Sequence, residues 1–253
     1  MIQVDKLRLS LGGTPILKGI TASMPDTGIT AIIGPNGSGK STFLHTVAGL
    51  LTPDIGTVRI EGHDVHAMAL ADRAKLFAIL TQSQPHLPRL TVADLVAFGR
   101  WPYHRGRPSE EDSVIVQQTL DRFELGALAR APLDTLSGGQ RQRAYIAMAC
   151  AQTTPYLFLD EPLSALDPRI SKLILSQLLA LTRDKRHSCR IVIVLHDLQL
   201  VAQWADHVIA IKDGVTFADG PAAEVMQNTR LSALYETEIS VRPQDDGRVA
   251  ILL

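Results

Sequence analysis

Short apolar runs alternate with longer amphipathic stretches along the chain. Continuous apolar runs are typical of strands buried on both faces of a parallel sheet, whereas apolar residues spaced three to four apart indicate helices. The runs that predict strands are residues 2–11, 15–24, 29–33, 57–60, 76–80, 156–159, 190–195, 207–212 and 215–218. The stretches that predict helices are residues 41–50, 69–75, 92–98, 110–123, 141–151, 169–181, 198–204, 221–226 and 229–235. This alternation indicates an α/β domain built on a mostly parallel sheet.

Both ends of the chain predict paired strands. Residues 2–11 and 15–24 are separated by a turn at Gly12-Gly13, which gives the domain an N-terminal antiparallel β part. Near the other end, residues 239–243 and 249–253 flank Asp245-Asp246-Gly247 and predict a closing hairpin.

Residues 85–154 differ in composition from the rest of the chain. Prolines and basic residues surround a short apolar helix at 92–98, which Thr91 can cap together with Asp94. Further helices follow in this stretch, with no strand pattern between them. The predicted division is a single domain, residues 1–253, with an α/β core at residues 1–84 and 155–253 and an inserted α-helical subdomain at residues 85–154.

The segment GPNGSGKST, residues 34–42, matches the phosphate-binding pattern G-x-x-x-x-G-K-[ST] between a strand and a helix. Glycines let a backbone wrap around a polyphosphate, and the following helix N-terminus adds a partial positive charge. We expect Lys40 to contact the β- and γ-phosphates and the Ser41 hydroxyl to bind Mg²⁺. The residues predicted to bind nucleotide here are Gly34, Pro35, Asn36, Gly37, Ser38, Gly39, Lys40, Ser41 and Thr42.

Two acidic residues, Asp160 and Glu161, directly follow the apolar run 156–159. Ligands gather at the carboxyl ends of buried parallel strands. We therefore expect Asp160 to hold Mg²⁺, directly or through water, and Glu161 to orient and deprotonate an attacking water. Adjacent carboxylates are ordinarily surface residues, and the phosphate loop upstream is what favours the catalytic interpretation.

Two more polar residues follow buried runs. Gln82 comes after the run 76–80, and its side-chain amide could contact Mg²⁺ or the attacking water. His196 comes after the run 190–195, and we expect it to contact the γ-phosphate, although a lone histidine is more often structural. His196 would lie at the same edge of the sheet as Asp160.

The stretch Leu136-Ser137-Gly138-Gly139-Gln140 opens another helix with a serine and two glycines. Such a start presents N–H groups and a positive helix end without side-chain bulk, which favours a second phosphate contact. Because one phosphate loop is enough to hold a nucleotide, the second site indicates a nucleotide held by another copy of the protein.

Composition excludes several classes of protein. The chain is 45% hydrophobic and 20% charged with a net charge of −1, which is typical of a globular protein without a nucleic-acid-binding surface. No apolar run reaches the roughly 18 residues of a membrane span, and the start MIQVDKLRLS lacks the apolar core of a signal peptide. Cys150 and Cys189 favour core packing in a reducing compartment. We expect a soluble, cytoplasmic protein whose membrane role comes through a partner.

Taken in order, these motifs resemble the ATP-binding cassette subunit of a transporter. The resemblance covers nearly the whole chain, from the phosphate loop through Gln82, residues 136–140, Asp160-Glu161 and Ser164-Ala165-Leu166-Asp167 to His196. It implies a P-loop NTPase core of RecA-like type, Mg²⁺-dependent ATP hydrolysis and a head-to-tail homodimer with two ATP molecules at its interface. Each ATP would lie between the phosphate loop of one copy and Ser137, Gly138, Gly139 and Gln140 of the other, and Asp167 would help to couple the two sites.

A narrower resemblance is to importers of iron chelates: siderophores, haem and, more distantly, cobalamin. It rests on LTVADLVAFGR at residues 90–100 followed by Pro102-Tyr103, and on GGQRQRAYIAMA at residues 138–149. It implies two integral-membrane permease subunits, an indirectly associated periplasmic or lipoprotein substrate-binding protein, and a peripheral position on the cytoplasmic face of the inner membrane. A groove between Gln82 and about Arg107 would accept a helix of the membrane subunit, although its basic residues equally fit a solvated loop.

Two positions depart from the family's pattern. Leu11 stands before Gly12-Gly13, where an aromatic residue usually stacks on adenine, so only apolar contact is expected there. Leu163 replaces a small hydroxyl residue, and we expect little effect. An alternative function is a cytosolic, non-transport ATPase of the same architecture in assembly or repair, but no long coiled-coil insertion or tandem second cassette is present. A nucleotide-dependent module without turnover is disfavoured by Glu161 and His196.

Overall fold

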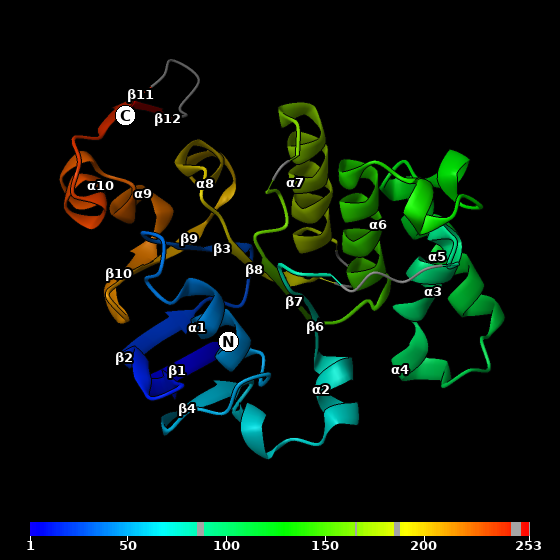
Figure 1. Cartoon of the computed structure of the whole chain (residues 1–253), viewed down its shortest axis with the longest axis horizontal. Coiled ribbons are helices and arrows are strands. Elements are labelled where there is room, and N and C mark those ends of the chain that lie inside the picture. The colour runs from blue at the N-terminus through cyan, green and yellow to red at the C-terminus, as the bar shows by residue number, and fades with distance from the viewer. Residues whose placement is uncertain (85–88, 165, 185–187, 244–248, 253) are drawn as a thin grey trace. The chain divides into compact units, whose positions relative to one another are not determined.

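The computed structural model describes residues 1–84, 89–164, 166–184, 188–243 and 249–252, which fold into two compact units (Figure 1). The first unit contains Met1–Met68 and Val192–Leu253, and the second contains Ala69–Ile191. Within the described residues, no helix combines the length and the apolarity needed to cross a membrane.

The first unit begins with an antiparallel sheet. Its strands are β1 (Ile2–Leu11), β2 (Thr14–Met24), β4 (Ile55–Ile60) and β5 (His63–Asp64), in the order β2-β1-β4-β5. Apolar residues of β1 such as Ile2 and Val4 are buried, while Gln3 between them is exposed. Because side chains alternate between the faces of a strand, one face of this sheet contributes to the core and the other contacts solvent.

A second sheet of this unit is built around the fully buried strand β3 (Ile29–Ile33). β3 runs parallel to β9 (His207–Lys212), which in turn pairs antiparallel with β10 (Val215–Pro221). The last residues of β8 (Arg190–Val194) belong to this unit and lie on the other side of β3. The remaining elements of the unit are the 3₁₀ turn Val65–Ala67, the helices α1 (Lys40–Val47), α8 (Leu198–Trp204), α9 (Ala222–Val225) and α10 (Asn228–Tyr235), and the hairpin strands β11 (Ser240–Pro243) and β12 (Val249–Leu252).

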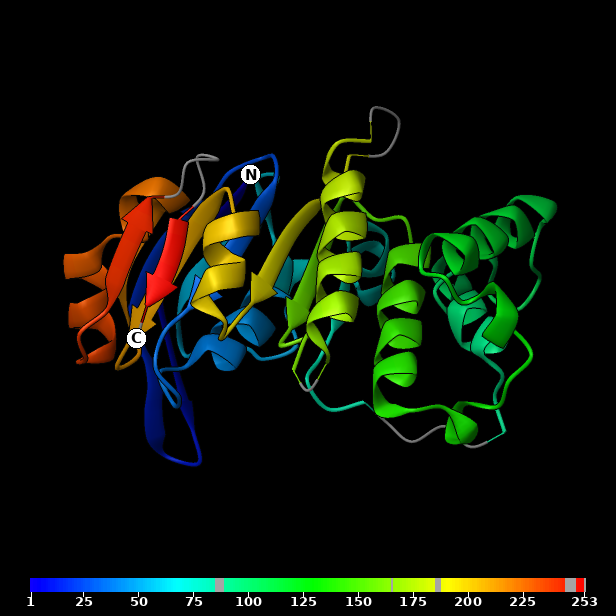
Figure 2. The same cartoon turned by 90° about the horizontal axis from the view of Figure 1, so that it is seen from above.

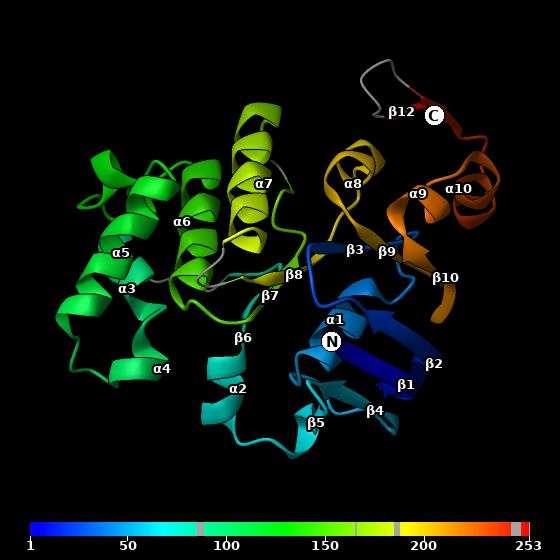
Figure 3. The same ribbon diagram turned by 180° about the vertical axis from the view of Figure 1, so that it is seen from behind.

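The second unit combines two parallel strands with a group of helices. β6 (Phe77–Leu80) pairs with β7 (Tyr156–Asp160), with Leu80 opposite Leu159. The helices are α2 (Leu70–Leu76), α3 (Val92–Phe98), α4 (Trp101–His104), α5 (Glu110–Arg122), α6 (Gly138–Ala151) and α7 (Pro168–Thr182), with 3₁₀ turns at Gly126–Leu128 and Leu133–Thr135. Figures 2 and 3 show α3, α5 and α6 side by side, and Leu95, Leu120 and Ile146 from these helices are buried.

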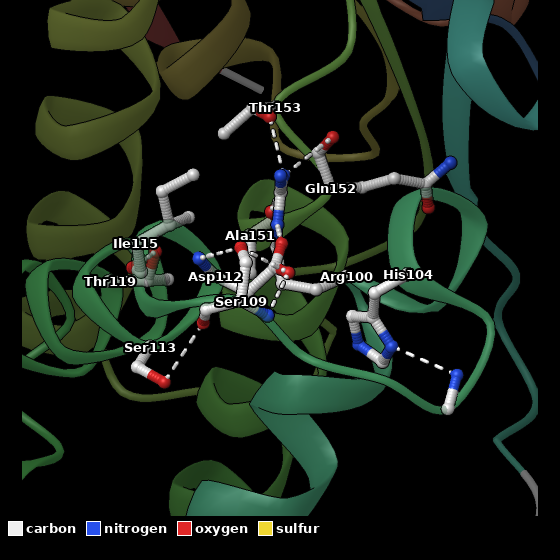
Figure 4. Close-up of polar contacts among 11 residues, drawn as sticks. Arg100, His104, Ser109, Asp112, Ser113, Ile115, Thr119, Ala151, Gln152 and Thr153 are labelled. Atoms are coloured by element: carbon white, nitrogen blue, oxygen red, sulfur yellow. Dashed lines mark hydrogen bonds and ion pairs between the residues drawn. The ribbon is translucent and has the colours of Figure 1, made fainter.

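A buried arginine fastens the helices of the second unit together (Figure 4). The Arg100 Nε atom lies 2.9 Å from Asp112 Oδ1, and its Nη1 atom donates to the carbonyl oxygen of Ala151 at 3.0 Å and to Thr153 Oγ1 at 2.7 Å. Asp112 also accepts a hydrogen bond from the Ser109 N–H, and this bond, together with Arg100, lowers the pKa of Asp112 to about 2. The carboxylate thus stays ionised, and Arg100 joins it, at the start of α5, to the end of α6.

The predicted α/β fold class, with an antiparallel part at the start of the chain, is confirmed. Helix α4 was not predicted, because four residues are too few to display a helical period. Helix α6 begins at Gly138 rather than Arg141, because the Ser137 cap offsets the low helix propensity of two glycines. The turn of the predicted hairpin and Ala165 lie outside the described residues.

Both cysteines are free thiols. Cys189 is buried and Cys150 is half-buried. Burial raises the pKa of both thiols, that of Cys189 to about 12, so neither is a ready thiolate nucleophile.

Candidate active site

The phosphate-loop segment leaves β3 and turns into α1. Gly34, Gly37 and Gly39 have φ angles of +149°, +76° and +100°, a region that other residues rarely adopt. At Gly34 a side chain is also excluded by space, because a Cβ atom there would overlap the carbonyl oxygen of Ile211 in β9. The loop therefore needs glycine both for its backbone conformation and for its packing on β9.

Lys40 is only 5% exposed and lies over this loop. Its Nζ atom donates to the carbonyl oxygens of Gly34 at 3.0 Å and Pro35 at 2.9 Å. The Ser38 hydroxyl is also buried and has no hydrogen-bond partner among the described residues. A phosphate group would supply acceptor oxygens to both side chains, so the loop fits a polyphosphate chemically.

The start of α1 has no side-chain cap. Its N-cap residue is Gly39, so no side chain caps the helix, and its first turn contains no acidic residue. The first N–H groups of a helix have no intrahelical partner and carry a partial positive charge. Ser41 and Thr42 lie half-buried in this turn. The helix start is therefore suited to bind an anion.

His196 and Leu11, the other predicted site residues of the first unit, lie in different surroundings. His196 is exposed and follows β8, where the N–H of Leu195 donates to the carbonyl oxygen of Ile32 at 3.3 Å. This bond places the His196 turn beside the end of β3, from which the phosphate loop leaves. Leu11 ends β1 and is 43% exposed, so it offers apolar surface without a ring.

Gln82 and Glu161 meet at the end of the β6–β7 pair in the second unit. The Gln82 Nε2 atom donates to Glu161 Oε2 at 2.8 Å. Because a hydrogen bond from an amide fixes the direction of a carboxylate, Gln82 holds the Glu161 side chain in one orientation. Gln82 and Glu161, which follow different strands, thus form a hydrogen-bonded pair.

The backbone at Glu161 is held in an unusual conformation. Its φ angle is +48°, which is unfavourable for a residue with a side chain. A tight turn fixes it, because the Glu161 carbonyl oxygen accepts hydrogen bonds from the Ser164 N–H at 3.3 Å and the Ser164 hydroxyl at 2.9 Å. Such backbone strain at Glu161 persists only where the surroundings impose it, and it is common at catalytic residues. The preceding residue, Asp160 at the end of β7, is 1% exposed.

Ser137 and Gln140 form a capping box at the start of α6. The Ser137 hydroxyl accepts from the Gln140 N–H at 3.3 Å, and Gln140 Oε1 accepts from the Ser137 N–H at 3.0 Å. Gly138 and Gly139 occupy the first turn. The cap thus uses the N–H groups of the two flanking residues and leaves a first turn without side-chain bulk.

Two further contacts connect this segment to its surroundings. Gln142 Nε2 donates to the carbonyl oxygen of Pro162 at 3.1 Å, which joins α6 to the turn after Glu161. Asp167 is exposed and caps α7 by accepting from the Ile170 N–H at 3.0 Å. Gln142 was missed as a functional candidate, because a glutamine inside a helix has no pattern that distinguishes it from a surface residue.

The predicted site residues are distributed over both units. The first unit contains Leu11, residues 34–42 and His196, and the second contains Gln82, residues 137–140, Asp160, Glu161 and Asp167. No local pattern in the sequence distinguishes Tyr235 of α10, whose hydroxyl lies close enough to the Gly34 backbone for that backbone to affect its pKa. Burial raises the pKa of Tyr235 to about 12, so it remains a neutral hydroxyl.

Oxygen donors dominate among the residues predicted to bind the metal ion. Ser41, Gln82 and Asp160 offer a hydroxyl, an amide oxygen and a carboxylate, which suit Mg²⁺. The described part of the chain contains no cluster of three or more His, Cys, Asp or Glu side chains able to hold a metal ion. This donor set fits an ion that takes its other ligands from phosphate and water rather than from a protein cage.

Comparison with known proteins identifies the family of this chain. Residues 17–164 match the family described as "ABC transporter". The petrobactin import ATP-binding protein YclP of Bacillus subtilis is 38% identical over 99% of both chains. The iron(3+)-hydroxamate import ATP-binding protein FhuC of B. subtilis is 36% identical over 95% of this chain and 89% of its own. The ferric enterobactin transport ATP-binding protein FepC of Escherichia coli is 37% identical over 91% and 85%.

Solved structures share the fold. A chain from a metal-chelate type ABC transporter in an inward-facing conformation aligns with a TM-score of 0.83 and 23% identity, over 100% of this chain and 97% of that one. A dimeric ATP-binding cassette in a post-hydrolysis state, bound to ADP and Pi, aligns with a TM-score of 0.78 and 27% identity, over 88% and 99%. Motifs, relatives and fold agree, and the chain belongs to the ABC transporter family.

Proposed function

We propose that this chain is the ATP-hydrolysing subunit of an importer of iron chelates. The hydrogen-bonded pair of Gln82 and Glu161, in a chain that also contains a phosphate loop, carries the catalytic part of this proposal. The relatives support the transport part, because those named for petrobactin, iron(3+)-hydroxamate, achromobactin, hemin and ferric enterobactin each align with over nine-tenths of this chain. None of these names favours the alternative role in assembly or repair.

Different side chains would perform different parts of the reaction. A bound Mg²⁺ would neutralise the charge that develops on the γ-phosphate of ATP. Lys40 and the N–H groups of the loop and of α1 would bind phosphate oxygens, while Ser41, Asp160 and Gln82 would hold the metal ion. Glu161 would orient a water molecule and accept its proton, with Gln82 fixing its direction. His196 would contact the γ-phosphate.

The segment around Ser137 would act on a nucleotide bound by a second copy of the chain. Gly138 and Gly139 leave the first turn of α6 open, and Ser137 is exposed beside them. We infer a head-to-tail homodimer in which Ser137, Gly138 and Gly139 of one protomer face the phosphate loop of its partner, with Asp167 coupling the two sites. Gln140, which fixes Ser137 in the capping box, would hold this segment in shape.

Residues 85–154, proposed as a helical subdomain, carry exposed aromatic side chains that suit a membrane partner. Phe98, Trp101 and Tyr103 are 46%, 52% and 41% exposed. The Phe98 and Trp101 rings lie 6.4 Å apart, and the Arg100 guanidinium lies 4.1 Å from the Tyr103 ring centre. Exposed aromatic groups commonly mark contact sites. We assign this surface to a helix of one of two permease subunits, which would hold the chain at the cytoplasmic face of the inner membrane.

Two assays test the proposal. Purified protein should release phosphate from ATP when Mg²⁺ is added. A strain lacking this chain should lose growth on a ferric siderophore or haem as sole iron source, and the wild-type chain but not its Lys40→Ala variant should restore it. Unimpaired growth on every iron chelate would exclude the transport role, whereas absence of phosphate release would exclude the ATPase role.

A further inference from the structure

The hairpin β11–β12 at residues 240–243 and 249–252 forms a separate two-stranded sheet. An isolated two-stranded hairpin is marginally stable in water, so its position depends on contacts with other elements. Val241 lies opposite Ile251 in its register, and the N–H groups of both residues donate outward to side chains rather than to each other. The contacts made by these outer edges therefore decide where the hairpin sits.

One edge is held by a single side chain of α8. Gln199 Nε2 donates to the carbonyl oxygen of Val249 at 2.8 Å, and Gln199 Oε1 accepts from the N–H of Ile251 at 2.9 Å. The amide thus satisfies an acceptor and a donor two residues apart, as a neighbouring strand would. Both functional atoms of this half-buried side chain are used.

The other edge is held by α10. The N–H of Val241 donates to Asn228 Oδ1 at 2.7 Å. Just before β11, the N–H of Ile239 donates to the Ser232 hydroxyl at 2.9 Å. The α10 helix is itself anchored, because Lys212 Nζ donates to the carbonyl oxygen of Ala233 and lies 2.8 Å from Glu236. The hairpin therefore bridges α8 and a fixed helix.

Helix α8 starts at Leu198, two residues after His196. It has only seven residues, and Asp197 caps it by accepting from the N–H groups of Gln199 at 2.8 Å and Leu200 at 3.2 Å. Gln199 is thus joined to the residue after His196 by its backbone and to β12 by its side chain. A short helix gains little stability from its own hydrogen bonds, so the hairpin contact restrains the helix that follows His196 in the chain.

We propose that residues 228–243 and 249–252 clamp α8, and that Gln199 is a positioning residue for His196 during ATP hydrolysis. The inference rests on the proposed contact of His196 with the γ-phosphate. The same segment lies near the phosphate loop, because the Tyr235 hydroxyl is close enough to the Gly34 backbone for that backbone to affect its pKa. The segment would restrain His196 without contacting the substrate.

The test compares Gln199→Leu with Gln203→Leu, which makes the same change at an exposed position of the same helix. A misplaced catalytic group lowers kcat more than binding, so Gln199→Leu should lower kcat about fivefold while KM and nucleotide affinity change by less than about twofold. Gln203→Leu should match the wild type. Hydrogen exchange at residues 249–252 should rise in Gln199→Leu alone.

Two further variants keep the test decisive if Gln199→Leu unfolds. Asn228→Ala removes the hydrogen bond from the Val241 N–H, which holds the other edge of the hairpin, and it should also lower kcat. Gln199→Glu keeps the acceptor for the Ile251 N–H and should restore part of the rate. Added to His196→Ala, the Gln199→Leu change should cause no further loss, because both act on one group.

The outcomes separate the two hypotheses. A wild-type kcat in Gln199→Leu and Asn228→Ala, with raised exchange at residues 249–252 and an inactive His196→Ala variant, would overturn the positioning role alone. Full turnover in His196→Ala would overturn the proposed function of His196 as well. An equal loss of kcat and nucleotide affinity in Gln199→Leu would indicate a purely structural contact and would also overturn the inference.

Discussion

Helix α1 follows a glycine and helix α6 begins with two, but their first turns are stabilised in different ways. The start of α1 has Gly39 as its N-cap and no side-chain cap, and Lys40 lies buried over the preceding loop. The start of α6 is closed by the reciprocal hydrogen bonds of Ser137 and Gln140. The first therefore lacks a stabilising side-chain cap, whereas the second is stabilised by its own side chains.

This difference indicates a division of labour. A helix start that lacks a cap gains stability when an anion binds, so α1 is suited to hold the nucleotide tightly. A helix start that is already capped loses less stability when no ligand is bound, so α6 is suited to a contact that forms and breaks. Such a contact fits a dimer that closes on ATP and opens after hydrolysis.

Glu161→Gln should give the largest effect and tests whether binding and turnover are separable. The amide cannot accept the proton of water, so kcat should fall by about 10²- to 10³-fold. Nucleotide affinity should stay near that of the wild type, because α1 and its loop are unchanged. Phosphate release and equilibrium binding measure the two quantities.

The same variant tests the role of α6. Saturated with ATP, Glu161→Gln should form a stable dimer in sedimentation experiments, and adding Ser137→Arg should prevent it. A strictly monomeric Glu161→Gln protein under saturating ATP would contradict the paired arrangement.

Lys40→Ala should remove the binding function of the first unit. Hydrogen bonds between an ammonium and phosphate oxygens contribute roughly 1.5–3 kcal/mol each, so affinity for ATP should fall by about 100-fold or more. Lys172→Ala, at an exposed position of α7, is the matched control. Undiminished affinity in titration calorimetry would disprove the assignment of the loop.

Ser137→Ala should lower turnover about tenfold while single-chain nucleotide binding stays unchanged, since Ser137 acts on the partner's nucleotide. Loss of the cap also costs about 1 kcal/mol of stability. Ser109→Ala removes the equivalent capping serine of α5 and separates the two effects. If both variants lose turnover equally, the effect of Ser137 is structural.

Leu11→Tyr should give the smallest effect. An aromatic ring can stack on adenine where Leu11 offers only apolar contact, and such stacking contributes about 0.5–1.5 kcal/mol. ATP affinity should therefore rise by about two- to tenfold, with Leu11→Ile as control. An unchanged affinity would indicate that the end of β1 does not contact the base.

Local patterns predicted most of the elements correctly, because apolar residues recur every two residues in strands and every three to four residues in helices. Those patterns failed where an element is short or is stabilised from outside. The four-residue α4 was missed, and α6 starts earlier than predicted because of its capping box. Residues such as Gln142, Gln199 and Tyr235 act through partners distant in sequence, so no local pattern distinguishes them.

The sequence by itself determined the phosphate loop, the order of the motifs and the family, because each depends on residue types at fixed short spacings. Only the tertiary structure decided that Gln82 donates to Glu161, that Glu161 has a left-handed backbone, and that Gln199 ties the last strand to α8. Such contacts join residues far apart in the chain, and their hydrogen bonds exist only once the strands and helices have packed together.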